Sequence, residues 1–396
     1  MIAFTFPGQG SQKPGAGAAW TSHPSWSVVD AASDAAGRDV ARLLLDADAD
    51  ELRHTDNAQL STYVASLLVL DAVRRAGIDA SYVAGHSLGE YTALTAAGVL
   101  SLEDGVRLVV ARGSAMRDAA TQKTGTMAAV LGADDDAVEL ACSQTRAAHK
   151  GSAAGEVWVA NYNSEGQVVI AGSAEGIEAA GALAKDAGAK RVMPVAVSGA
   201  FHTPYMAPAQ RALDAALAGA RLADADVPAA ANVDGAVHTS GREWTALLSE
   251  QLCNPVRWRQ LLAGLAGVGV DTFIELGPGT VLTGLTKRGV DGASTHNAST
   301  PEGVDELQAA LPVQARSRVE GETLYAVERL LVSTAAGVFE PAASLRDGAR
   351  VNVGDVLGRV GEHVVRSRFS GFVIGQLARQ GERVATSQPL AWLRVF

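Results

Sequence analysis

The chain has 396 residues, of which 47% are hydrophobic and 19% are charged, and its formal net charge is −10. This length and composition are typical of a folded protein with more than one domain and exclude wholesale disorder. The acidic balance argues against bulk binding of nucleic acid. No signal-peptide pattern and no apolar run of membrane-span length occur, so we expect a cytoplasmic protein without membrane contact.

The two cysteines, Cys142 and Cys253, are too few for a disulfide framework and lack metal-ligand spacing. We expect core or near-surface thiols and no metal site. An acidic protein can still present a local basic patch to an acidic partner. The candidates for such a patch, for which scattered solvated charge is an equally good interpretation, are Arg257, Arg259, Lys287 and Arg288.

The N-terminal part predicts two strands that end in chemically informative turns. Residues 2–6 lead into a glycine-rich turn carrying Gln9, whose amide can donate a hydrogen bond to an oxyanion. Residues 82–85 lead into Gly85-His86-Ser87-Leu88-Gly89. A G-x-S-x-G turn between strand and helix strains the serine backbone and exposes its Oγ at the helix N-terminus, which predicts a nucleophile at Ser87. Alternatively, the glycines only allow tight packing and Ser87 caps the helix.

The order of elements predicts an α/β fold. Helical patterns at 60–75 and 102–118 flank the strand at 82–85. Residues 126–197 follow a β-α-β-β-α-β order, which is the ferredoxin-like pattern. This stretch ends shortly before His202, which lies in a turn, and a neutral imidazole is the side chain best suited to accept a serine proton near pH 7. A strand at 271–276 and a helix at 301–311 complete the first domain, and residues 289–320 otherwise lack apolar periodicity.

The C-terminal region has short β-type runs and an internal repeat. Residues 337–357 recur as 371–390 at an offset of 33 to 34 residues. Two such halves resemble the biotinyl/lipoyl barrel-sandwich hybrid, although a generic small β-sandwich is the alternative. No lysine occurs after Lys287, so the turn near Gly361-Glu362-His363 offers no amine for biotin or lipoate. We expect a linker at 313–323 and an unmodified β domain at 324–396.

Six segments spread over residues 1–312 together resemble the malonyl-CoA:acyl carrier protein transacylase family. The resemblance implies a hydrolase-like large subdomain with an inserted ferredoxin-like small subdomain at about 126–197, and an active site in the cleft between them. The segments are Phe6–Gln12, Gly85–Tyr91, Arg112-Gly113 with Met116, Gly199–Pro204, Asn254–Trp258 and Glu275–Gly279.

The resemblance also implies roles for single residues. Ser87 would form an acyl-enzyme ester, His202 would be its base, and Gln9 with the backbone N–H of Leu88 would form the oxyanion hole. The backbone carbonyl of Asn254 would orient His202, with an acidic partner such as Asp104 or Asp186 as the alternative. His86 is interpreted as a packing residue of the elbow.

The resemblance assigns the substrate pocket as well. Arg112 lies in an apolar helix and coincides with the family's carboxylate-binding arginine, which would hold a malonyl carboxylate through two charge-assisted hydrogen bonds. Met116 belongs to the same motif. Phe201 would crowd an α-methyl group and so favour malonyl.

The implied reaction moves malonyl from malonyl-CoA through Ser87 to the pantetheine thiol of an acyl carrier protein, in fatty-acid or polyketide synthesis and without a bound cofactor. We expect the appended domain to dock the carrier protein or a synthase partner. One alternative is a thioesterase-type serine hydrolase, which would share Ser87 and His202 but has no need of Arg112. Another is a trans-acting polyketide acyltransferase that uses a different extender unit.

Overall fold

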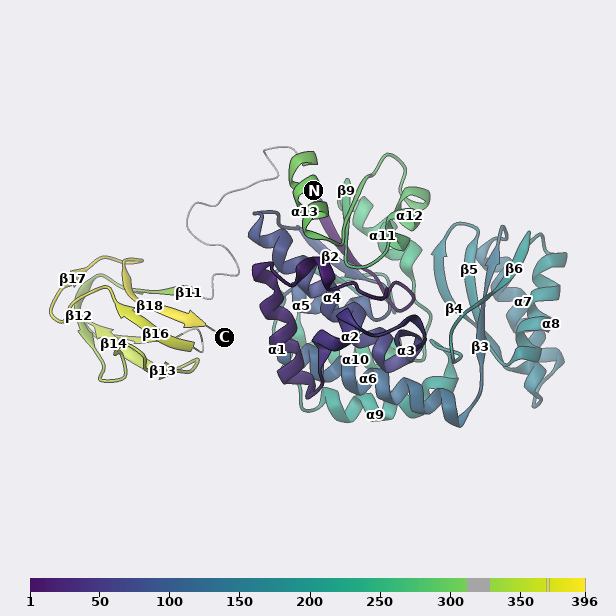
Figure 1. Cartoon of the computed structure of the whole chain (residues 1–396), viewed down its shortest axis with the longest axis horizontal. Coiled ribbons are helices and arrows are strands. Elements are labelled where there is room, and N and C mark those ends of the chain that lie inside the picture. Colours follow the sequence, from purple (N-terminus) through teal and green to yellow (C-terminus); the bar gives the residue numbers. More distant parts are fainter. Residues whose placement is uncertain (312–327, 368, 370, 396) are drawn as a thin grey trace. The chain divides into compact units, whose positions relative to one another are not determined.

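The protein is represented by a computed structural model that describes residues 1–311, 328–367, 369 and 371–395. The chain divides into two compact units, Met1–Ser317 and Arg318–Phe396, which are described separately (Figure 1). The predicted linker at 313–323 lies outside the described residues.

The larger sheet of the first unit has six strands in the order β10-β9-β1-β2-β7-β8. All neighbours run parallel except β7 and β8. Because carboxyl ends of parallel strands meet at one edge, the turns after β1, β2, β7 and β9 come together there. The bounds are β1 (Ile2–Phe6), β2 (Tyr82–Gly85), β7 (Ala229–Ala230), β8 (Val237–His238), β9 (Thr272–Leu276) and β10 (Ser294–Ala298).

This sheet is buried on both faces, as parallel sheets usually are. Phe4 and Phe6 of β1 belong to one core with the helices α4 and α6, whereas Ala3 belongs to a second core with α11 and α12. The helices around the sheet are α1 (Ser27–Ala36), α2 (Val40–Leu45), α3 (Ala49–Arg53), α4 (Thr55–Arg75), α5 (Gly89–Ala96), α6 (Leu102–Gln122), α9 (Ala207–Leu217), α10 (Gly241–Gln251), α11 (Trp258–Gly267), α12 (Val281–Gly289) and α13 (Pro301–Ala310).

Two expectations for this part need correction. The helix predicted at 60–75 already begins at Thr55, and nearly all of its residues as far as Val73 are buried. The strand β10 lies in a stretch that showed no apolar periodicity. Its residues Ser-Thr-His-Asn-Ala are mostly part-exposed, and the strand forms because its backbone pairs with β9 at the edge of the sheet.

The smaller sheet has the strand order β4-β5-β3-β6 and is antiparallel throughout. Its helices α7 and α8 pack together beside it (Figure 1) and share a separate core that includes Cys142. The chain order β3-α7-β4-β5-α8-β6 matches the predicted order of elements. The bounds are β3 (Thr126–Leu131), α7 (Asp135–Ala148), β4 (Val157–Ser164), β5 (Gln167–Gly172), α8 (Ala174–Asp186) and β6 (Arg191–Val195).

The second unit contains two four-stranded sheets, β11-β18-β16-β13 and β15-β14-β12-β17. The repeat appears in the pairing: β12 pairs with β14 and β17, and β16 pairs in the same way with β18 and β13. A separate apolar core joins the sheets. The bounds are β11 (Glu328–Val332), β12 (Gly337–Pro341), β13 (Arg350–Val351), β14 (Val356–Val360), β15 (His363–Arg366), β16 (Gly371–Gln376), β17 (Arg383–Val384) and β18 (Pro389–Val395).

Among the described helices, none combines the length and the apolar character that a bilayer crossing requires. A cytoplasmic location stays a prediction.

Candidate active site

Ser87 lies in a sharp turn between β2 and α5 and has a φ of 53°, in the left-handed region that L-residues rarely adopt. The glycines on either side are required by close approach. A Cβ on Gly85 would lie 1.9 Å from the backbone of Gly89, and a Cβ on Gly89 would lie 2.0 Å from the carbonyl oxygen of Phe6. The motif is therefore a genuine elbow that packs against the end of β1, and Ser87 is not simply a helix cap.

Two side chains hold the strained backbone of Ser87. Its N–H donates to Oδ1 of Asn232 at 2.6 Å, and its carbonyl accepts from Nε2 of Gln251 at 2.8 Å. Asn232 follows β7 and also donates to the carbonyl of Gly85 at 2.7 Å. The elbow is thus held by Asn232, which follows β7, and by Gln251 at the end of α10.

His202 is placed to act as the base. Its Nε2 lies 2.7 Å from Oγ of Ser87, and its Nδ1 lies 2.8 Å from the backbone carbonyl of Gln251. A carbonyl can only accept, so Nδ1 carries the proton and Nε2 of the neutral ring is free to take one from Ser87. His202 also has a positive φ, of 60°.

The partner of His202 differs from the expectation. The hydrogen bond runs to the carbonyl of Gln251, and the backbone of Asn254 makes only a lesser contribution to the pKa of the ring. The backbone N–H of Asp104 donates to Oγ of Ser101 at the start of α6, and its carboxylate pairs with Arg107, whereas Asp186 ends α8 beside the small sheet. Neither carboxylate forms a hydrogen bond with His202 in the described part of the chain. A main-chain carbonyl was expected in this role and is present, but it belongs to Gln251 and not to Asn254.

Burial lowers the pKa of His202 from 6.5 to about 3, and the positive charge of Arg112 lowers it further within that shift. The imidazole is therefore neutral at physiological pH. A neutral ring with a fixed tautomer is the form that a general base requires.

Arg112 lies on α6 and is 1% exposed. Its Nη2 donates to Oγ of Ser87 at 3.1 Å and to Oε1 of Gln251 at 2.8 Å, while Nη1 donates to Oε1 of Gln59 at 2.8 Å. Its Nε is buried and makes no hydrogen bond of ordinary geometry with a described residue, although the Tyr91 ring packs 5.4 Å from the guanidinium carbon and helps to keep Arg112 charged. A buried guanidinium with an unpaired donor next to the nucleophile is suited to an anionic group on the substrate.

Met116 and Phe201 have different settings. The sulfur of Met116 accepts from Nε2 of Gln59, so it supports the residue that holds Arg112. Phe201 is 5% exposed, and its ring lies where a Cβ on Gly199 would approach to 2.9 Å. Both side chains are buried in the main core. Their predicted contact with the acyl group stays a prediction.

The expected oxyanion donors are available. In the described part of the chain, neither the backbone N–H of Leu88 nor the side-chain amide of Gln9 donates to a protein acceptor. The turn that carries Gln9 lies close to the elbow, since a Cβ on Gly8 would meet the carbonyl oxygen of His86 at 2.6 Å. Two free donors near Ser87 fit the role of stabilising an oxyanion.

His86 matches its interpretation as a packing residue. Its Nε2 lies 2.9 Å from Oδ1 of Asn163, and its ring packs against Trp258 with centroids 5.5 Å apart. Burial lowers its pKa. The ring therefore supports the elbow in its neutral form.

A buried carboxyl, Glu90, lies in the first turn of α5. Its Oε1 accepts from the backbone N–H of Asn232 at 2.6 Å, and its Oε2 accepts from Nε2 of Gln251 at 2.5 Å. Burial raises the pKa of Glu90 to about 8, whereas both hydrogen bonds and the charge of Arg112 act to lower it.

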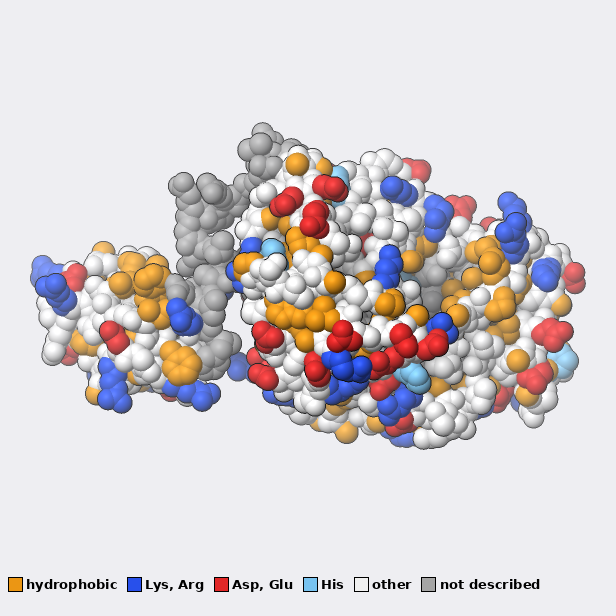
Figure 2. Space-filling model, in the orientation of Figure 1, with side chains coloured by type: hydrophobic (Ala, Val, Ile, Leu, Met, Phe, Trp, Pro, Cys, Tyr) orange, Lys and Arg blue, Asp and Glu red, His pale blue; other side chains and the backbone are white. Residues whose placement is uncertain are grey.

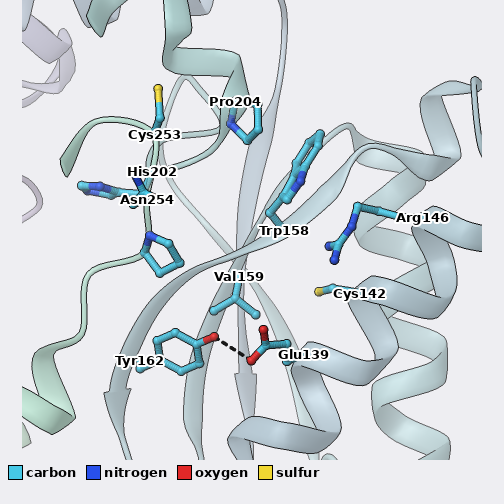
Figure 3. A pocket seen from close by; sticks show the side chains of 11 residues that line it. Glu139, Cys142, Arg146, Trp158, Val159, Tyr162, His202, Pro204, Cys253 and Asn254 are labelled. Atoms are coloured by element: carbon cyan, nitrogen blue, oxygen red, sulfur yellow. Dashed lines mark hydrogen bonds between the residues drawn. The ribbon is translucent and has the colours of Figure 1, made fainter. Parts of the chain in front are cut away.

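A pocket of about 270 Å³ has His202 on its wall (Figure 3). The small sheet and α7 contribute Trp158, Arg146 and a hydrogen-bonded pair in which Tyr162 donates to Glu139 at 3.0 Å. Both cysteines also line it. Burial raises the pKa of Cys142 to about 12 and that of Cys253 to about 11, so neither is an activated thiol.

The predicted basic patch is largely engaged in internal contacts. Arg257 donates to the carbonyl of Val233, and Arg259 pairs with Asp135 at 2.8 Å. Arg288 donates to Gln167. Three of the four candidates therefore have a partner within the protein.

Four residues of the site were missed by sequence reasoning. Glu90 lies within the motif Gly85–Tyr91, but the motif indicates no role for it. Asn232 follows a strand of only two residues, which is too short for a periodic signal. Gln251 lies three residues before Asn254, just outside the segment Asn254–Trp258. Gln59 lies on a helix with no motif.

The assembled site places the hydroxyl of Ser87 between a neutral imidazole and a buried guanidinium, with two unpaired N–H donors close by. No group of three or more His, Cys, Asp or Glu side chains that could hold a metal ion occurs among the residues described.

Comparison with known proteins agrees with this chemistry. Residues 3–313 match the model of the acyl transferase domain family. The chain is 41% identical over 306 residues to the malonyl CoA-acyl carrier protein transacylase of Bacillus subtilis, covering 77% of this chain and 95% of that protein. It resembles the structure of an acyl carrier protein S-malonyltransferase from Vibrio cholerae, with a TM-score of 0.73, 36% identity, and coverage of 77% and 99%. It also resembles a malonyl-transacylase solved in complex with a type II PKS acyl-carrier protein, with a TM-score of 0.73, 37% identity, and coverage of 78% and 99%.

Proposed function

Because the chain belongs to the family of malonyl CoA-acyl carrier protein transacylases, we propose that it transfers malonyl from malonyl-CoA to an acyl carrier protein through an ester on Ser87. The partner is supported by the related transacylase that was solved with its acyl-carrier protein. The pathway is fatty-acid or polyketide synthesis, and the reaction needs no cofactor besides its thioester substrate.

The reaction consists of two half-reactions that use the same groups. Ser87 Oγ attacks the thioester carbonyl while Nε2 of His202 takes its proton, and the proton then passes to the departing CoA sulfur. The pantetheine thiol of the carrier next gives its proton to His202 and attacks the ester, and the proton returns to Ser87 Oγ. The N–H groups of Leu88 and Gln9 hold the oxyanion in both directions.

The observation that carries the choice of substrate is the position of Arg112. Its Nη2 is 3.1 Å from Ser87 Oγ, and its Nε is buried and makes no hydrogen bond of ordinary geometry in the described part of the chain. A malonyl group on Ser87 would bring its free carboxylate to this guanidinium, whereas an acetyl group would leave the cation unmatched. Phe201, which we assign to the acyl pocket with Met116, disfavours an α-methyl substituent.

Intact-mass measurement after incubation with malonyl-CoA alone tests the mechanism. We expect one malonyl adduct that is absent in Ser87→Ala, because the first half-reaction needs no acceptor. A thioesterase-type hydrolase would instead release malonate continuously without a carrier protein. Steady malonate release without an accumulating adduct would overturn the transferase assignment. If a greater fraction of the protein were acylated by methylmalonyl-CoA than by malonyl-CoA, the alternative extender unit would be favoured.

For the fold we adopt the finer description implied by the family: a hydrolase-like large part with a ferredoxin-like small part at about 126–197. The strand order β4-β5-β3-β6, with two helices on one face, supports the second name.

For the C-terminal unit we propose a biotinyl/lipoyl-like domain without prosthetic group that docks the carrier protein or a synthase partner. The fold is supported by the strand pairing, because each half contributes one short strand that pairs with the other half: β17 pairs with β12, and β13 pairs with β16. The β14–β15 hairpin at Gly361-Glu362 has no lysine for biotin or lipoate. Charge supports an acidic partner, since residues 318–396 contain 10 Lys and Arg against 8 Asp and Glu, whereas residues 1–317 contain 23 against 35.

One face of this unit fits such a partner. Apolar side chains gather on its surface beside arginines (Figure 2). On the sheet β11-β18-β16-β13, Trp392 is 41% and Phe372 is 44% exposed, and Phe372 lies in register with Arg350 and Arg394. Exposed aromatics beside arginine are typical of protein interfaces.

Steady-state transfer to holo-carrier protein tests the docking role. Trp392→Ser with Phe372→Ser should raise KM for the carrier about tenfold and leave self-acylation unchanged. The matched control is Val338→Ser with Val364→Ser, which removes equally exposed apolar side chains from the other sheet. Equal KM values in both double variants would contradict carrier docking at this face.

A further inference from the structure

Glu90 is a buried carboxyl group that the reaction itself does not use. It is 1% exposed, and both of its carboxylate oxygens accept a hydrogen bond: one from the backbone N–H of Asn232, the other from Nε2 of Gln251. Hydrogen bonds that run toward both oxygens favour the ionised carboxylate.

The two partners of Glu90 are the two residues that hold the nucleophile. Asn232 accepts from the N–H of Ser87, and Gln251 donates to its carbonyl. A serine in the left-handed region is strained and persists only where its surroundings determine it. Glu90 therefore accepts hydrogen bonds from both residues that hold the strained backbone of Ser87.

Gln251 also connects Glu90 to Arg112. Guanidinium only donates and carboxylate only accepts, so the amide of Gln251 has one satisfactory orientation, with Oε1 toward Arg112 and Nε2 toward Glu90. The backbone carbonyl of the same residue fixes the tautomer of His202. A single hydrogen-bond chain thus runs from the carboxylate to the carboxylate-binding arginine.

We propose that Glu90 is a positioning residue that sets substrate choice, because its carboxylate fixes Gln251 and, through it, the guanidinium of Arg112 beside Ser87. This inference rests on the proposed malonyl transfer. It adds that selectivity for an acidic acyl group depends on a carboxylate that never touches the substrate.

Glu90→Gln tests the proposal with almost no change in shape. Glutamine offers one acceptor and one donor, whereas both neighbours of Glu90 are donors. The variant must therefore lose one hydrogen bond or turn the amide of Gln251, which would face Arg112 with its NH₂ group. We expect kcat/KM with malonyl-CoA to fall ten- to a hundredfold, and kcat/KM with acetyl-CoA to fall about threefold.

Glu275→Gln is the matched control. Glu275 is also 1% exposed and accepts from the backbone N–H groups of Leu282 and Thr283, at the start of α12. It has no contact with Ser87, His202 or Arg112, so the ratio of malonyl to acetyl activity should stay at the wild-type value in this variant.

The effect must also disappear when Arg112 is absent. In the Arg112→Ala background, adding Glu90→Gln should change the ratio of malonyl to acetyl kcat/KM less than twofold, because the hydrogen-bond chain from Glu90 through Gln251 then no longer reaches a guanidinium. A merely structural role would lower both activities in parallel and lower Tm, without changing the ratio.

An unchanged ratio in Glu90→Gln, or an equal change in Glu275→Gln, would overturn the proposal. If Glu90→Gln does not fold, Gln251→Met carries the test, because it removes the bridge and leaves Glu90 bonded to Asn232. Retention of the wild-type ratio in that variant would also refute it. Failure of the wild type to form a malonyl adduct would instead refute the proposed function, so the two failures are distinct.

Discussion

Replacing Arg112 by alanine separates recognition of the carboxylate from acyl transfer itself. The variant keeps Ser87, His202 and both oxyanion donors, so acetyl transfer should fall by less than about threefold. Malonyl transfer should fall much further, because the substrate carboxylate would be buried against the neutral amides of Gln59 and Gln251 without a cation.

The size of the effect follows from the hydrogen bonds involved. A hydrogen bond to a charged group is worth about 1.5 to 3 kcal/mol, so the ratio of malonyl to acetyl kcat/KM should fall about ten- to a hundredfold. Arg112→Lys keeps the charge but loses the planar fork, and should lie between wild type and Arg112→Ala.

Rates of acyl-enzyme formation from malonyl-CoA and acetyl-CoA, measured by quenched flow and intact mass, give this ratio directly. Arg117→Ala is the control, because Arg117 lies on the same helix but is exposed and pairs with Asp56 and Asp118. The ratio should not change in the control. If Arg112→Ala retained the wild-type ratio, Arg112 would be a structural residue and the proposed pocket would be wrong.

Three further outcomes are expected. His202→Ala should slow acylation at least about a hundredfold, measured in the same assay, and a smaller loss would argue against general-base catalysis. Because the pKa of His202 is lowered to about 3, kcat/KM for acylation by acetyl-CoA should fall by less than about threefold between pH 8 and pH 5, whereas a base titrating at 6.5 would lose about tenfold for each unit below that value. A chain ending at residue 312 should still acylate Ser87, since all site residues precede it, and loss of self-acylation in a folded truncation would show that the C-terminal unit completes the site.

The sequence was most informative where chemistry requires a particular residue in a particular turn. Ser87 and Gly85 could be identified because the elbow tolerates nothing larger, as the 1.9 Å approach at Gly85 shows. Arg112 could be identified because a charged side chain in an apolar helix is costly to bury unless it binds a partner. Strand and helix positions followed from periodicity wherever one face was clearly apolar.

The remaining residues could not be predicted, because their roles depend on tertiary contacts. Asn232 and Gln251 are separated from Ser87 by 145 and 164 positions, and an amide carries no signal of what it will bind. The prediction of Asn254 in place of Gln251 concerned a backbone carbonyl, which every residue has. The strand β10 was missed for the same reason, since backbone pairing at its edge outweighs its polar side chains.

Under the proposed function, Arg112 would also link substrate choice to the strength of the base. In the free enzyme its charge helps to hold the pKa of His202 low, which disfavours the protonated imidazole that each half-reaction forms. A malonyl carboxylate bound to the guanidinium would compensate that charge and raise the basicity of the ring. An acetyl group would leave the charge in place and meet a weaker base. Because Gln251 accepts from both residues, one through its side chain and the other through its backbone, recognition of the carboxylate and activation of Ser87 depend on the same few contacts.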